Sequence, residues 1–217
     1  QAAKLLFNEG LPHPTRPMGA AFLFGLPYLF LPNASVSTIV GFNIGLNLGL
    51  WLATILLIDR TVRLFSNEKL AFTFALAYIF CVGAIGHISL VLTETLTTFL
   101  LTFATFRAFR FVKFSNSSDL AAAVSVMVLT VLIRPGMLYW SLLLAVLYLI
   151  HGFKTRTLSF NQALPIFLAL SILGFQATRV FQTYGNFTVS YIDKTTWYNY
   201  LGAEVEASET NRAYEDV

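Results

Sequence analysis

Residues 36–58 form an apolar run of 23 residues that contains no charged side chain. The hydrocarbon core of a bilayer is about 30 Å thick, and about 20 helical residues are needed to cross it. In lipid, a single segment must satisfy its own backbone hydrogen bonds, which a helix does. The run therefore predicts a membrane-spanning helix and restricts the fold to a helical bundle embedded in lipid.

The composition of the whole chain agrees with a membrane protein. Of its 217 residues, 56% are hydrophobic and 12% are charged, whereas a soluble domain carries about 25% charged residues. The high apolar content excludes a disordered chain, and the single cysteine excludes a disulfide scaffold. The net charge of +3 is small and scattered along the chain, so we expect no nucleic acid partner.

Four further apolar segments approach the length of a membrane span: residues 70–92, 95–111, 120–150 and 163–178. The third is interrupted by Arg134-Pro135-Gly136. As one helix it would be about 46 Å long, which exceeds the thickness of the hydrocarbon core. Proline removes a backbone donor and clashes with the preceding helical turn. The segment is therefore either one kinked helix or a hairpin of two short helices.

The positions of the basic residues favour the hairpin. With a hairpin, eight of the fourteen Lys and Arg residues fall in three loops on one side of the membrane, at 59–69, 107–119 and 151–162. The short connections on the other side carry none, at 32–35 and 87–94. Because basic loops stay in the cytoplasm, the first side is predicted to be cytoplasmic. We therefore predict two helices over 120–133 and 137–150.

The remaining segments complete the predicted architecture. Residues 17–31 are apolar but short and contain Pro27, which suits an interfacial or re-entrant helix. Residues 1–16 and 180–217 are predicted to be outer loops that meet over the mouth of the bundle. The fold class is an all-α, polytopic membrane helical bundle of about six spanning or half-spanning helices plus an interfacial helix. The chain lacks an initial Met and an intact signal peptide, so we expect a processed chain or a piece of a longer protein.

Polar side chains at membrane depth are costly, and they mark candidate functional sites. Glu94 begins a helix after Thr93. Its carboxylate is either simply stabilised there by the helix dipole, or it supports a functional site. Arg134 stands at the tip of the predicted hairpin. It either extends to the membrane interface or binds an anion such as phosphate through two parallel hydrogen bonds.

Other polar residues add to this picture. Arg16 lies between prolines in the first outer segment, and together with Arg134 it suggests an outward-facing phosphate site. His87 has two possible roles: it is either only an interfacial polar residue, or it acts as a ligand or acid–base group. Asn43 and Asn47 share one helix face, which favours hydrogen bonds between helices. The sequence has no motif typical of a metal or nucleotide site.

Four short motifs follow one another along the chain. They are Ala2–Gly10 leading into Arg16-Pro17-Met18-Gly19, then Val91-Leu92-Thr93-Glu94, then Leu132-Ile133-Arg134-Pro135-Gly136, and finally the stretch from Arg179 to Ser190. In this order they resemble the amino-terminal half of GT-C membrane glycosyltransferases. The resemblance is closest to the dolichyl-phosphate-mannose–protein mannosyltransferases and the bacterial aminoarabinose and mannosyl transferases. Two features depart from that pattern: Met18 replaces a second proline, and the Asn-Tyr pair after the arginine is missing.

The resemblance implies an enzyme that moves a sugar from a polyprenyl-phosphate donor to a hydroxyl of a protein, lipid or glycan. Its active face would be periplasmic or lumenal, in a bacterial inner membrane or the endoplasmic reticulum. Arg16 matches the position that contacts the lipid phosphate, and Arg134 is a weaker second contact. Glu94 would support the site, and His87 and Arg179 are further candidate substrate-binding residues. The catalytic aspartate would precede Gln1, so the catalytic base and any cofactor stay unassigned.

Two other functions fit the same sequence. A transporter or flippase for lipid-linked or small solutes would use the broken hairpin and the polar face of Asn43 and Asn47. A non-catalytic membrane subunit would pack against partners through Gly41, Gly45 and Gly49, which recur every four residues.

Overall fold

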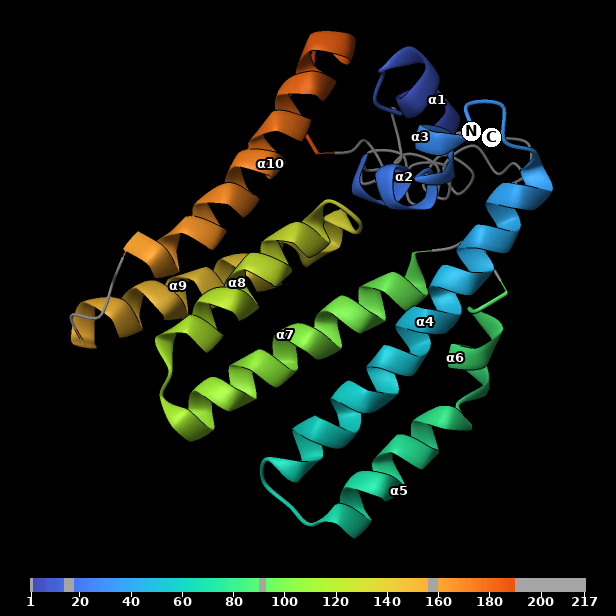
Figure 1. Ribbon diagram of the computed structural model, residues 1–217. Helices are drawn as coiled ribbons and strands as arrows, with labels where there is room; N and C mark the ends of the chain where they lie inside the picture. Colours follow the sequence, from blue (N-terminus) through green and yellow to red (C-terminus); the bar gives the residue numbers. More distant parts are fainter. Residues whose placement is uncertain (1, 14–17, 90–92, 156–159, 190–217) are drawn as a thin grey trace, which may run out of the picture.

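A computed structural model of the chain describes residues 2–13, 18–89, 93–155 and 160–189. Within these ranges the secondary structure is helical, and no strand is present (Figure 1). The helices are α1 (Ala2–Glu9), α2 (Met18–Phe24), α3 (Pro27–Phe30), α4 (Val36–Arg63), α5 (Glu68–Ile79), α6 (Val82–Gly86), α7 (Glu94–Phe114), α8 (Ser117–Val131), α9 (Leu138–Thr155) and α10 (Phe160–Tyr184), with a 3₁₀ turn, η1, at Pro135–Met137.

Three helical segments are long and apolar enough to cross a membrane: Val36–Arg63, Pro135–Lys154 and Ala163–Tyr184. Most of their residues are not buried within the protein. Large apolar side chains such as Leu56, Leu149 and Phe167 are exposed. A soluble protein rarely exposes so much contiguous apolar surface, whereas lipid solvates it readily. The described part of the chain is therefore helical throughout its secondary structure, and its three long apolar helices indicate a membrane protein.

The helix predicted over 70–92 is not one continuous element, because the chain forms two helices here. Helix α5 has 12 residues, and α6 has five. Between them Cys81 has an extended backbone (φ −70°, ψ 103°), and Gly83 and Gly86 weaken the helix that follows because glycine is a poor helix former. At 1.5 Å per residue, α5 is about 18 Å long and does not reach across the hydrocarbon core.

Helix α7 is continuous, but it is not among the three segments that meet the criteria for a membrane span. It carries Arg107, Arg110 and Lys113 near its end. The uncharged stretch from Thr95 to Phe106 is about 18 Å long. The count of six spans is therefore not confirmed.

The core of the bundle surrounds α8. Eleven of its fifteen residues are buried, and α7, α9 and α10 all pack against it. Leu120, Val124 and Val128 form the centre of a cluster with Tyr148 and Ala169. After α8 the chain turns through η1 and returns as α9, so residues 120–150 form two helices packed side by side (Figure 1).

The predicted interfacial helix over 17–31 is divided into α2 and α3. Gly25 lies in the turn between them, where a Cβ atom would approach the Phe7 ring to 2.5 Å. Pro27 begins α3, a position that proline tolerates because no donor is needed there. The outer loop predicted over 1–16 contains α1, which packs on α2.

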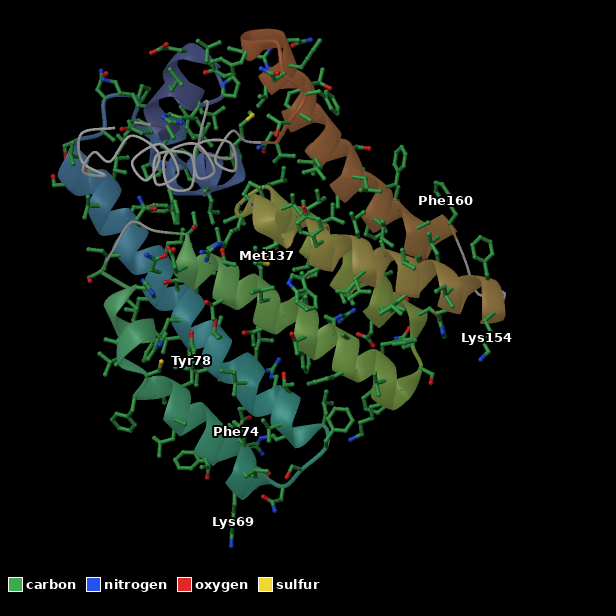
Figure 2. All side chains as sticks on the ribbon, turned by 180° about the vertical axis from the view of Figure 1, so that it is seen from behind. Lys69, Phe74, Tyr78, Met137, Lys154 and Phe160 are labelled. Carbon is green, nitrogen blue, oxygen red and sulfur yellow. The ribbon has the colours of Figure 1, made fainter. Side chains whose placement is uncertain are left out.

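The basic turns lie at one end of the bundle and the short helices at the other. The α4–α5 and α7–α8 turns, the end of α9 and the start of α10 share the first end, and Lys69 and Lys154 project there (Figure 2). Helices α1–α3 lie at the opposite end, near the start of α4 and the end of α10 (Figure 1). We call the first end the basic end and the second the outer end.

Candidate functional site

A backbone hydrogen bond joins two of the motifs found in the sequence. The Gly19 N–H, at the start of α2, donates to the carbonyl oxygen of Leu132 at 3.1 Å. A Cβ atom on Gly19 would lie 2.8 Å from both the Cβ and the carbonyl oxygen of Leu132. The contact therefore needs glycine, and it places the start of α2 directly on the hairpin turn. Arg16, which precedes Gly19 in the same motif, lies outside the described residues.

Arg134 follows this contact by two residues. It precedes η1 with an extended backbone (φ −138°, ψ 98°), and its side chain is exposed. Its backbone N–H donates to the carbonyl oxygen of Thr130. Within the described ranges, no ion pair or side-chain hydrogen bond engages its guanidinium. Arg134 therefore presents a cation at the outer end of the hairpin.

An apolar groove begins close to this turn. It lies between α7 and α9 over α8 and has a volume of about 390 Å³. Met137 lies at its hairpin end, where Figure 2 labels it. The groove is lined by Leu101, Ala104, Thr105, Ala108, Met127, Met137, Trp140, Leu143 and Leu144. This lining suits a hydrocarbon chain, because nearly all of it is apolar.

Glu94 and His87 lie at the connection from α6 to α7. The Thr95 hydroxyl donates to the His87 carbonyl oxygen at 3.4 Å, which brings the two sides of this connection together. Among the described residues, Glu94 Oε2 and His87 Nδ1 are buried and have no hydrogen-bond partner. Thr93 makes no side-chain cap to α7. Buried polar atoms nearly always have a partner, so this pair is a candidate contact for a bound polar group.

Arg179 has a partner within the protein. Its Nη2 donates to the Gly10 carbonyl oxygen at 2.8 Å, and the Tyr184 hydroxyl donates to the Pro12 carbonyl oxygen at 2.7 Å. These bonds fasten the segment after α1 to the last turns of α10. The expected meeting of the two ends of the chain is thus observed for these residues, and Arg179 helps to hold it.

Asn43 and Asn47 are fully buried on α4. Asn43 Nδ2 donates to the Ile39 carbonyl oxygen at 2.8 Å and to the Phe24 carbonyl oxygen of α2 at 3.3 Å. Asn47 Nδ2 donates to the Ile88 carbonyl oxygen at 3.4 Å. The prediction of hydrogen bonds between helices is confirmed for Asn43, and this face is packed rather than open.

The sequence reasoning missed a buried carboxylate at the basic end. Ser115 has a positive φ of 53°, and Asn116 caps α8 by accepting from the Ser118 N–H at 3.0 Å. The chain thus reverses within two residues and brings Asp119 against α7. There Asp119 Oδ1 lies 2.9 Å from Arg107 Nε and 3.5 Å from Arg110 Nε. In the sequence, the signal for this cluster is one carboxylate, Asp119, shortly after Arg107 and Arg110, which indicate only topology when taken alone.

Replacing Gly19 with Ala should loosen the outer end. The new methyl group would overlap the Leu132 backbone, and such overpacking costs about 1–3 kcal/mol. Gly136→Ala is the matched control, because a Cβ there meets nothing within 4 Å. Thermal unfolding in detergent micelles measures both variants. Equal midpoints for the two would contradict the close contact of α2 with the hairpin.

Comparisons with known proteins return no relative. No family model matches the chain, and neither a curated protein nor a solved structure matches it. Among the described residues, no group of three or more His, Cys, Asp or Glu side chains is placed to hold a metal ion. The comparisons place the chain in no family.

Proposed function

We propose that the chain is part of a membrane glycosyltransferase that takes a sugar from a polyprenyl-phosphate donor and passes it to an acceptor hydroxyl at the outer face. The observation that carries the proposal is the bond between Gly19 and Leu132. It joins the motif that contains Arg16 to the motif that contains Arg134. The bond thus brings Gly19, three residues after Arg16 in the sequence, onto the motif that contains Arg134.

The groove supports the same proposal. A polyprenyl phosphate combines a long apolar chain with an anionic head. The groove between α7 and α9 offers an apolar channel, and Arg134 lies three residues before Met137 at its hairpin end. A guanidinium binds phosphate through parallel hydrogen bonds. The prenyl chain would lie in the groove with its phosphate at the hairpin turn.

The proposed chemistry follows from this arrangement. Negative charge grows on the departing phosphate in the transition state, and a fixed cation stabilises it. A carboxylate removes the proton from the acceptor hydroxyl as that oxygen attacks the anomeric carbon. No residue of this chain is assigned as that base. Glu94, with its buried Oε2, supports the site, and the neighbouring Thr95 hydroxyl donates to the His87 carbonyl oxygen.

The proposal extends to the topology. In it, α5 with α6, α7 and α8 are spanning or half-spanning elements that complete about six crossings with the three long segments. The basic end faces the cytoplasm, and the outer end faces the periplasm or the lumen of the endoplasmic reticulum. The acceptor is a protein, lipid or glycan on that side.

Filling the groove tests the proposal. Ala108 lines the groove, whereas Val112, one turn further along α7, lies outside it and is 67% exposed. Ala108→Trp should weaken binding of a polyprenyl phosphate about tenfold, because the ring takes the space of the prenyl chain. Val112→Trp should leave binding unchanged. Binding to the full-length protein in nanodiscs measures both, and equal affinities for the two variants would remove the groove from the proposal.

A second candidate function rests on the glycine face of α4. A Cβ atom on Gly41, Gly45 or Gly49 would meet nothing within 4 Å. Helices in lipid associate through such small residues, so the face suits a partner helix of a non-catalytic subunit. Disulfide crosslinking from Gly45→Cys to a separate chain would favour this function, and crosslinks confined to a single chain would count against it.

A further inference from the structure

The basic end of the bundle contains an uneven cluster of charges. Asp119, in the first turn of α8, is 1% exposed. Arg107 and Arg110 lie one turn apart on α7, and the Nε atom of each faces the same carboxylate oxygen. Two guanidinium groups thus share one carboxylate, which leaves a surplus of one positive charge.

In the neighbouring α4–α5 turn, one arginine is shared by two carboxylates. Arg63 pairs with Asp59 and with Glu68, each at 2.7 Å. These two carboxylates are therefore engaged by their own arginine and do not neutralise Arg107 or Arg110. The surplus cation at the α7–α8 turn is a local feature, distinct from the general basic character of this end.

The two arginines are held with one edge inward and one edge available. Their Nε atoms are buried, while their side chains are 26% and 38% exposed. Within the described part of the chain, no hydrogen bond engages the terminal Nη atoms of either side chain. The ion pairs with Asp119 hold the Nε side of both guanidinium groups inward, so their Nη atoms remain able to donate to the oxygens of a phosphate.

The surroundings indicate where such a phosphate would come from. The guanidinium of Arg110 lies over the Phe106 ring, 5.8 Å from its centre, and Phe109, between the two arginines in the sequence, is 42% exposed. Apolar rings beside cations are typical of the membrane interface, where apolar side chains meet acyl chains and cations meet headgroups. A free phosphate has no apolar group that would contact the apolar part of this surface.

We propose that Arg107 and Arg110, oriented by Asp119, bind the phosphate of an anionic phospholipid in the cytoplasmic leaflet. The site lies at the opposite end of α7 from Glu94, and it is independent of the proposed glycosyltransferase function. The headgroup would lie on the two guanidinium groups, and the acyl chains would run from there toward the middle of the bilayer, past Phe106 and Phe109.

The test compares two variants that each lower the net charge by one. R107Q/R110Q/D119N removes the two guanidinium groups together with the buried carboxylate, so that no unpaired charge remains inside. Arg60→Gln removes an exposed cation at the same end of the bundle. The full-length protein is reconstituted in vesicles of phosphatidylcholine and phosphatidylglycerol. Spin-labelled forms of both lipids then report the preference of the protein for the anionic headgroup.

We expect the wild type and Arg60→Gln to prefer phosphatidylglycerol and the triple variant to lose about tenfold of that preference. R107K/R110K retains the charges and the pairing with Asp119, and it should lose part of the preference because an ammonium group lacks the forked N–H donors of a guanidinium. An unchanged preference in either cluster variant would overturn the proposal. So would an equal loss in Arg60→Gln, or displacement of the lipid by inorganic phosphate.

Discussion

Replacing Arg107 and Arg110 together with Gln should lower the free energy of unfolding by about 3–5 kcal/mol, because a buried carboxylate would lose both counter-charges. Asp119 is 1% exposed, so its carboxylate cannot turn to water. Since native proteins are stable by only about 5–15 kcal/mol, this loss is a large share of the total. Unfolding by denaturant in mixed micelles measures it.

Replacing Asp119 instead of the two arginines should lower the free energy of unfolding much less. In Asp119→Asn the two arginines lose their partner, but at 26% and 38% exposure they can extend toward headgroups. Combining Asp119→Asn with the double arginine change should recover most of the lost stability, because no buried charge is left unpaired. A triple variant no more stable than R107Q/R110Q would contradict this account of the cluster.

Under the proposed function, replacing Arg134 with Ala should reduce sugar transfer about a hundredfold, the usual effect of removing one group that stabilises transition-state charge. Arg134 is exposed, and its side chain bonds no described residue, so the loss should leave the fold intact. Arg134→Lys should restore part of the rate, because the charge returns without the fork. Transfer from a polyprenyl-phosphate sugar to an acceptor measures the effect.

Arg60 supplies the control for this prediction. It is exposed at the basic end, so Arg60→Ala should leave transfer unchanged. Arg16→Ala should behave like Arg134→Ala, since the two motifs are joined through Gly19 and Leu132. Unchanged transfer in both Arg16→Ala and Arg134→Ala would remove the phosphate contact from the proposal.

The features that sequence predicted best depend on local patterns. The uncharged run from residue 36 appears as α4, and Ser35 caps it by accepting from the Thr38 N–H. The break at Pro135 appears as a turn between α8 and α9. Hydrophobic length and proline chemistry act within a few residues, so a sequence displays them directly.

The interruption at Cys81 could not be predicted in the same way. Residues 70–92 have the composition of one span, yet the helix stops at Ile79. The Ile88 carbonyl oxygen, beyond the break, accepts from the buried Asn47 of α4. Such a partner lies 41 positions away in the chain, and tertiary contacts of this kind override local helix preference.

The same distinction between local patterns and distant contacts applies to the candidate site. Sequence placed Glu94 and His87 near one interface, and the structure joins their segments through Thr95. The sequence did not show that Gly19 lies on Leu132 or that Asp119 is buried against two arginines. Both features arise where helices distant in sequence meet, and residue type alone does not reveal which helices do so.

Photo-crosslinking tests the central claim most directly. A polyprenyl phosphate with a photoreactive group on its prenyl chain is bound to the full-length protein in nanodiscs, and the labelled peptides are identified by mass spectrometry. The account predicts labelling of the groove, at Trp140 or Leu144 on α9 and at Leu101 or Ala108 on α7, and weaker labelling in Arg134→Ala. Labelling elsewhere on the bundle, or equal labelling by the phosphate and by the uncharged prenol, would contradict it.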